Sequence, residues 1–170
     1  MNETVEMGYE QFEQLVVFQL ANEYYGVDIG AVNTIIRMQD LTAVPQTPVF
    51  VEGVINLRGS IIPVIDLRKR FRLVQEPTTK SSRIVVVEAN GAMVGMIVDA
   101  VAETLRIPAD MIEPPAGVIA SVESEYLRGI AKQGDRLVIL LDIDLVMSGK
   151  EYENIIKSKL KTNVPENIAA

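Results

Sequence analysis

Four aspartates that follow apolar runs are the residues of this chain best suited to chemistry. Asp66, Asp99, Asp142 and Asp144 stand beside the ends of predicted strands. Paired carboxylates can transfer protons or hold Mg²⁺, and Asp142 and Asp144 would point the same way in an extended strand. Asp is also a preferred first residue of a helix, so each can simply cap a short helical turn. The pattern favours capping and leaves a Mg²⁺-dependent β-barrel enzyme as the alternative.

Composition removes most other chemistry. The 170 residues contain no Cys and no His, which excludes disulfides, thiolate and imidazole nucleophiles, and zinc, haem or iron–sulfur sites built on those residues. The sequence also lacks a phosphate-binding glycine loop, a Rossmann fingerprint and a serine elbow. An enzyme would therefore most plausibly use carboxylates, and a binding module without cofactor or metal is the better class.

The charge balance bears on partners and on location. A net charge of −7 opposes nonspecific binding to nucleic acid, so the basic run Arg68–Arg72 is interpreted as a solvated face rather than a phosphate site. No apolar run reaches the ~18 residues of a membrane helix, and the N-terminus is acidic instead of signal-like. These features predict a cytoplasmic protein that does not insert into a membrane.

The segment Val51–Leu67 contains the most informative single cation. It is predicted to form two strands, Gly53–Leu57 and Ile61–Asp66, joined by a tight turn that exposes Arg58. Asn56 suits the first turn position, and Gly59 can take a left-handed backbone and close the turn with a bulge. Arg58 is then either an ordinary solvated charge or a binding residue.

The chain shows an internal repeat. Leu15–Arg37 aligns without a gap over Ile84–Arg106, 69 residues later, and Val32 then corresponds to Val101. At an offset of 76, Gly53–Leu67 aligns over Gly129–Ile143. We interpret this as two structurally similar halves, about 15–74 and 83–147, each built of short strands.

Helices are predicted at few places. Ile29–Arg37 has the spacing for one or two turns, and Asp66 could cap a turn that ends at Phe71. A C-terminal helix is predicted over 148–161, because Ser148 and Glu151 have capping-box spacing. Residues 1–13 and 162–170 are predicted to be flexible tails. Pro63 predicts an edge strand or a bulge, since proline cannot donate to a ladder.

Two small barrels side by side would leave a groove between them. Val32 and Val101 would face each other across it, either as inter-barrel core or as an apolar surface for the helical tip of a partner.

The sequence resembles the CheW family of chemotaxis coupling proteins from Leu15 to about Glu151. The resemblance is carried by seven motifs: Tyr25–Ile29, Thr47–Phe50, Gly53–Gly59, Ile62–Arg68, Val94–Asp99, Glu125–Gly129 and Gly134–Leu140. It implies one domain over 15–151, mainly β, made of two SH3-like five-stranded β-barrel subdomains with a few short helices.

The resemblance also implies a function without catalysis. Such a protein is an adaptor between the cytoplasmic tip of transmembrane chemoreceptors and the regulatory domain of a CheA-type histidine kinase. It would be monomeric alone, join rings in arrays, and reach the membrane only through its partners.

Site residues are carried over from the family by position. The receptor tip is expected beside Val32, Arg58, Val98 and Val101. Thr34 departs from the family, in which glutamate is frequent. Kinase contacts are expected at Leu41, Val44, Glu113 and Val118. The 69-residue offset relates the loop Leu41–Pro45 to Asp110–Pro114, and the second loop continues through Val118. Relatives can carry a basic residue at Glu113 and an aromatic one at Val118.

Overall fold

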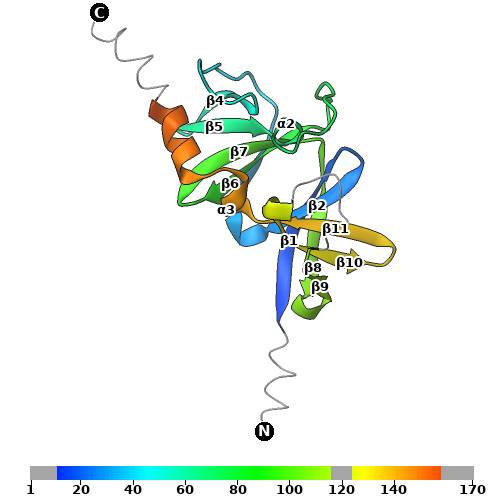
Figure 1. Cartoon of the computed structure of the whole chain (residues 1–170). Coiled ribbons are helices and arrows are strands. Elements are labelled where there is room, and N and C mark those ends of the chain that lie inside the picture. Colours follow the sequence, from blue (N-terminus) through cyan, green and yellow to red (C-terminus); the bar gives the residue numbers. More distant parts are fainter. Residues whose placement is uncertain (1–10, 116–123, 158–170) are drawn as a thin grey trace, which may run out of the picture.

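The computed structural model describes residues 11–115 and 124–157, most of which lie in β-strands (Figure 1). The predicted mainly-β class is confirmed. The strands form two mixed sheets, and short helical turns connect some of them. In the described part of the chain no helix has the length and apolar character to cross a membrane.

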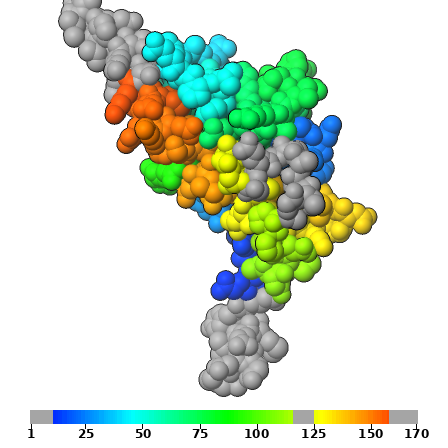
Figure 2. Space-filling view, in the orientation of Figure 1, coloured from blue at the N-terminus to red at the C-terminus, as the bar shows by residue number. Residues whose placement is uncertain are grey.

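One sheet has six strands. Their spatial order is β8 (Ala100–Pro108), β1 (Phe12–Leu20), β2 (Glu23–Asp28), β11 (Arg136–Leu141), β10 (Leu127–Gln133) and β9 (Ile112–Glu113). The only parallel contact in it joins β2 to β11. Two-residue turns close the hairpins β1–β2 and β10–β11, and the tip of the second projects from the body of the molecule (Figures 1 and 2).

The other sheet has five strands. Their spatial order is β3 (Val32–Arg37), β6 (Arg83–Ala89), β7 (Ala92–Val98), β5 (Ser60–Asp66) and β4 (Val51–Leu57). Here β5 and β7 run parallel and the other neighbours are antiparallel. The two sheets therefore have the same arrangement, two hairpins joined through one parallel contact.

Each sheet takes strands from both halves of the sequence. Hairpin β1–β2 pairs with β10–β11 and β8, whereas hairpin β6–β7 pairs with β4–β5 and β3. The expectation that residues 15–74 and 83–147 would each form their own barrel is therefore wrong. The chain crosses between the sheets twice, through the 3₁₀ turn η1 (Ile29–Ala31) and at Asp99.

The internal repeat itself is visible in the register of the strands. Gly26 lies opposite Leu140 in one parallel pair, and Gly95 lies opposite Val64 in the other, which are equivalent positions. A Cβ on Gly95 would come within 2.8 Å of Ile84 and 3.2 Å of Val64, so close strand packing requires glycine there. The bulges at Val51/Gly53 and Leu127/Gly129 are likewise equivalent. The repeat thus predicts which positions are equivalent in the two sheets. It does not predict that each sheet combines a hairpin from the first half with one from the second half.

Three buried clusters form the core. One lies within the six-stranded sheet and includes Leu15 and Val17; a second lies within the five-stranded sheet and includes Ile84 and Val86. A larger third cluster, which we call the shared core, contains residues from both sheets, among them Phe18 and Val87. Leu15 and Phe18 lie on opposite faces of β1 and both faces are covered, which explains why this strand lacks polar alternation.

The structure corrects two local predictions, one about a helix and one about a proline. Only Ile29–Ala31 is helical within the predicted stretch Ile29–Arg37, because Val32–Arg37 pairs with β6 as strand β3. Pro63 lies in an interior strand rather than at an edge. The ladder from β5 to β7 begins at Val64, so the missing N–H of the proline precedes the ladder instead of interrupting it.

Both predicted helix caps are present. Asp66 begins α2 (Leu67–Arg70) by accepting a hydrogen bond from the Arg68 backbone N at 2.9 Å. Ser148 and Glu151 form the predicted capping box, with reciprocal bonds of 2.9 and 3.1 Å. The helix that follows, described over 149–157, lies against the side of the molecule formed by β4 and β5 (Figure 2). It buries Ile155 in the shared core.

The N-terminal boundary also differs from the prediction. Residues 12 and 13 belong to strand β1, and Glu13 forms an ion pair with Arg128 at 2.8 Å. The predicted tail 1–13 is therefore too long by at least these two residues.

Candidate partner-binding surfaces

Arg58 lies on a tight and unusual turn. Leu57 pairs with Ser60, so Arg58 and Gly59 alone connect β4 to β5. Both residues have positive φ, 54° and 87°, and the Gly59 N–H donates to the Asn56 Oδ1 at 2.8 Å. This is a two-residue turn of the primed type, so the bulge predicted at Gly59 is wrong. Residues other than glycine rarely adopt a positive φ, and such conformations tend to occur at functional sites. The backbone of Arg58 is therefore one reason to consider this turn as a binding site.

The guanidinium of Arg58 is an available cation. Its side chain is exposed, and within the described residues no hydrogen bond or ion pair holds it. Arginine presents five donors in a planar fork that suits a carboxylate. Arg58 can therefore bind an acidic or polar group of a partner without first breaking an internal contact.

The two valines predicted for the groove lie just after the two crossovers. Val32 begins β3 and pairs with Val87 in the five-stranded sheet, while Val101 pairs with Phe18 in the six-stranded sheet. Both are half-buried and pack against the shared core. They therefore lie at the junction of the two sheets and keep some exposed surface. Their facing each other across a groove remains a prediction.

Val98 differs from its predicted neighbours. It is completely buried, as part of the shared core. It therefore supports the junction from inside and has no surface to offer a partner. Thr34, the position that was expected to depart from the family, is half-buried on β3, at the edge of the sheet opposite β4.

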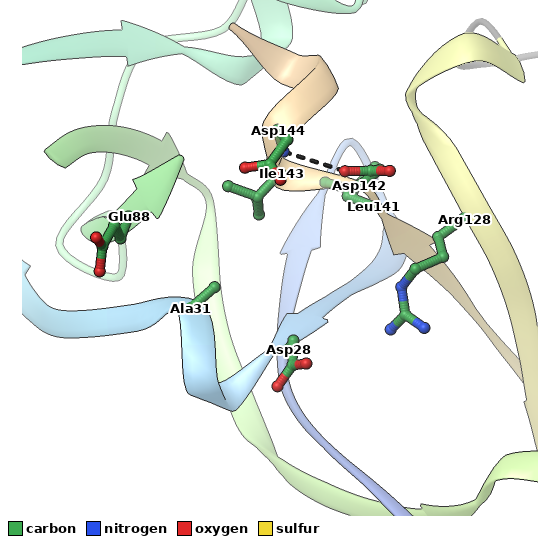
Figure 3. Close-up of a pocket in the computed structure, with 8 residues that line it drawn as sticks. All are labelled: Asp28, Ala31, Glu88, Arg128, Leu141, Asp142, Ile143 and Asp144. Atoms are coloured by element: carbon green, nitrogen blue, oxygen red, sulfur yellow. Dashed lines mark hydrogen bonds between the residues drawn. The ribbon is translucent and has the colours of Figure 1, made fainter. Parts of the chain in front are cut away.

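An acidic cleft of about 250 Å³ lies beside the first crossover (Figure 3). It is lined by Asp28, Ala31, Glu88, Arg128, Leu141, Asp142, Ile143 and Asp144. Arg128 reaches into it from β10, opposite Asp28 at the end of β2 (Figure 3). Sequence reasoning singled out Asp142 and Asp144 of this lining but missed Asp28, Glu88 and Arg128. The Asp28 Oδ1 accepts from the Gly30 N–H at 2.8 Å in an Asp-x-Gly turn, a local signal that could have pointed to it.

Asp142 and Asp144 do not form the carboxylate pair of an extended strand. Asp142 caps α3 (Ile143–Val146), accepting from the Asp144 N–H at 3.1 Å. Asp144 instead accepts from the backbone N–H of Asn90 at 2.9 Å. Within the described residues no group of three or more acidic side chains is arranged to hold a metal ion.

The residues predicted to contact a kinase lie at the outer edges of the two sheets. Thr42 bridges to Val54 of β4, and Glu113 pairs with Ile130 of β10. These bridges make Thr42 equivalent to Glu113, two residues away from the match given by the 69-residue offset. Leu41 is half-buried, Val44 is buried, and Glu113 is exposed with an ion pair to Lys132 at 2.9 Å. Val118 lies outside the described residues.

The basic run Arg68–Arg72 is not a solvated face. Arg68 pairs with Asp99 at 2.6 Å, Lys69 with Glu52 at 2.6 Å, and Arg70 with Glu151 at 3.2 Å. Arg70 also packs its guanidinium over the rings of Phe50 and Tyr126, at 4.2 and 5.3 Å from the ring centroids. These cations hold α2 to its surroundings, which leaves little free charge for a phosphate.

This chain has relatives among known proteins. The model of the CheW-like domain matches residues 14–151. The chain belongs to the CheW-like domain family. A chemotaxis protein CheW of Treponema pallidum is 38% identical over 151 residues, covering 86% of this chain and 88% of that protein. Chemotaxis protein CheW of Klebsiella aerogenes is 35% identical over 149 residues, covering 86% and 90%.

A solved CheW-like structure agrees with the fold. The crystal structure of scaffolding protein TtCheW from Thermoanaerobacter tengcongensis superposes with a TM-score of 0.78 at 43% identity, covering 83% of this chain and 97% of that one. The predicted class is confirmed: this CheW-like chain is a non-catalytic scaffold of chemotaxis signalling. The alternative of a Mg²⁺-dependent enzyme is wrong.

Proposed function

We propose that this CheW-like protein binds a chemoreceptor tip at the junction of its two sheets and a CheA-type kinase at its sheet edges. The observation that supports the receptor surface best is the exposed guanidinium of Arg58, which lies on a two-residue turn and has no hydrogen bond or ion pair to the described residues 11–115 and 124–157. Val32 and Val101 supply apolar surface beside the shared core. A fully buried valine contributes about 1.5 kcal/mol, so a few such contacts suffice for a weak but specific complex.

The kinase surface is argued from the repeat. The segment Leu41–Val44 lies beside the edge strand β4, and Glu113 lies in the edge strand β9, at equivalent ends of the two sheets. Exposed edge strands can pair with, or pack against, another protein. Two similar edges would let one scaffold contact two kinase regulatory domains and so extend into a ring. We infer that the protein is cytoplasmic and reaches receptor arrays through these partners.

The receptor proposal is tested by charge reversal at two equivalent turns. Arg58→Glu should weaken binding to a purified receptor cytoplasmic fragment about tenfold, which corresponds to about 1.4 kcal/mol. The matched control is Asp135→Lys, because Asp135 occupies the equivalent turn between β10 and β11. Titration calorimetry with the receptor fragment and, separately, with the kinase regulatory domain gives both affinities. Unchanged receptor affinity in Arg58→Glu contradicts the proposed role.

The kinase proposal has its own test. Glu113→Arg should change the affinity for the kinase regulatory domain at least fivefold while leaving receptor affinity intact. Lys132→Glu removes the same Glu113–Lys132 ion pair from its other side and controls for that loss. The pair is exposed and contributes little to stability, so both variants should fold. Equal kinase affinity in wild type and Glu113→Arg contradicts this surface.

A further inference from the structure

The two ends of the inter-sheet junction are held by different chemistry. At one end Asp144, in α3, accepts hydrogen bonds from the Asn90 backbone N–H and, through its carbonyl, from the Asn90 side chain, both at 2.9 Å. Asn90 begins the β6–β7 turn of the five-stranded sheet, and α3 follows β11 of the six-stranded sheet. This tether of direct hydrogen bonds joins the sheets beside the first crossover.

At the other end the repeat places a cation, which can only donate, where the first end has an acceptor. Arg68 occupies in α2 the position that Asp144 occupies in α3, at the offset of 76. Ala21, in the β1–β2 turn, corresponds to Asn90 at the offset of 69. A guanidinium cannot accept from the Ala21 N–H, so the direct tether of the first end is impossible here.

Asp99 makes the connection instead. Its carboxylate receives two bonds from Arg68, Nε to Oδ1 at 3.0 Å and Nη2 to Oδ2 at 2.6 Å, and one from the Ala21 N–H at 2.9 Å. The Asp99 N–H donates to the Gln19 carbonyl at 3.0 Å. Asp99 is the residue at which the chain leaves β7 for β8, and at the equivalent point of the first crossover stands Gly30, which has no side chain.

We propose that Arg68 and Asp99 are positioning residues that fix the orientation of the two sheets at the second crossover. Their bidentate geometry restricts rotation more than a single hydrogen bond does. Val101 lies two residues after Asp99, so the pair also sets where Val101 is presented to a receptor. This last step rests on the proposed receptor surface, whereas the fixing of the sheets does not.

The direct test measures the distance between the sheets. The chain has no Cys, so spin labels can be placed at Ser60→Cys in β5 and Thr104→Cys in β8, both exposed positions on different sheets. Asp99→Asn keeps the shape and an acceptor for Ala21 but removes the charge. We expect its distance distribution from pulsed electron spin resonance to be broader than that of the wild type.

Lys69→Gln is the matched control. Lys69 is on the same helix and forms an ion pair with Glu52 in β4, within one sheet, so its loss should leave the distribution unchanged. Arg68→Lys is the second variant, which keeps the charge but loses the bidentate fork, and it should broaden the distribution less than Asp99→Asn. If Asp99→Asn fails to fold, Arg68→Lys tests the inference in its place.

Binding separates this inference from the proposed function. A broader distribution with receptor affinity at least threefold weaker and kinase affinity unchanged supports both. A broader distribution with unchanged receptor affinity supports the fixing of the sheets and contradicts the receptor surface at Val101. A distribution as narrow as that of the wild type in a folded Asp99→Asn or Arg68→Lys variant overturns the inference.

Discussion

At the scale of single residues, backbone conformation and close contact decide which positions tolerate change. Gly53 and Gly134 both have positive φ, 152° and 60°. A Cβ on Gly53 would meet the Thr42 carbonyl oxygen at 2.5 Å, whereas nothing lies within 4 Å of one on Gly134. Gly134 therefore shows the cost of a left-handed backbone alone, whereas Gly53 combines a conformation that L residues rarely adopt with a clash against backbone.

Alanine at each of these positions gives the first prediction. Gly134→Ala should lower the free energy of unfolding by about 1 kcal/mol, the cost of a left-handed alanine. Gly53→Ala should cost at least about 3 kcal/mol, because the Thr42–Val54 bridge must also move. Urea denaturation followed by circular dichroism measures both. Equal losses in the two variants would show that the close approach to Thr42 is unimportant.

The charge of Asp99 predicts a pH dependence of stability. Burial by itself raises the pKa of Asp99, but the hydrogen bonds from Arg68 and Ala21 outweigh this effect and lower the pKa below its usual value. Because the folded-state pKa is lower than the unfolded one, near 3.9, the stabilisation is fully present above about pH 4 and is lost as the pH falls through the folded-state value. Arg68, itself near Glu76 and Asp66, is the charge that faces this carboxylate.

We expect wild type and Asp99→Asn to differ in stability at neutral pH and to lose this difference in acid. Wild type should be more stable than Asp99→Asn at pH 7, and this difference in stability should shrink below about pH 4 and vanish once the pH is below the folded-state pKa of Asp99. Thermal unfolding at several pH values provides the measurement. The pKa of Asp66 is raised, chiefly by burial, so protonation of Asp66 at low pH favours the folded state. This effect on stability is present in both proteins and therefore cancels in the comparison. A difference that persists at low pH contradicts the assignment to the Asp99 charge.

At the scale of elements, the C-terminal helix depends on its cap and on one buried side chain. Ser148 and Glu151 satisfy each other's backbone N–H groups at the start of the helix, and Ile155 is 1% exposed. Arg70 holds this region from α2, donating to the Val146 carbonyl at 2.6 Å and to Glu151. The helix is therefore joined to the shared core by its cap, by the burial of Ile155 and by the contacts of Arg70.

Substitutions in this helix should lower the free energy of unfolding by amounts that depend on the interaction each one removes. Ser148→Ala should cost about 1 kcal/mol of unfolding free energy through the lost cap. Ile155→Ala should cost about 2–4 kcal/mol because it leaves a cavity in the shared core. Ser60→Ala, at an exposed position in β5, serves as the control and should change stability by less than about 0.5 kcal/mol. A neutral effect of Ile155→Ala would show that the helix is not part of the cooperative core.

At the scale of the whole molecule, the exchange of hairpins makes the two sequence halves interdependent. Neither 1–78 nor 79–170 contains all strands of either sheet. Each half alone would expose hairpins that lack their parallel partner and an uncovered part of the shared core. Separately expressed halves should therefore be unfolded, and mixing them should restore the folded protein. Dispersed amide resonances from one half alone would contradict this prediction.

The sequence by itself determined the local features. Asp66 and Ser148 are caps, and a tight turn exposes Arg58 between β4 and β5, because each of these depends on a few neighbouring residues. The repeat and the family motifs also gave the mainly-β class and the scaffold function. In these cases a short stretch of chain contains the whole physical cause.

Only the tertiary structure decided which strand pairs share a sheet and which charges meet. Equivalent hairpins have similar edges, so nothing local distinguishes pairing within a half from pairing across halves. Ion pairs such as Arg68–Asp99 join residues 31 positions apart, which made a basic run appear solvated. Val98 was likewise predicted at a surface and lies in the shared core, because its burial depends on the packing of both sheets rather than on its own strand.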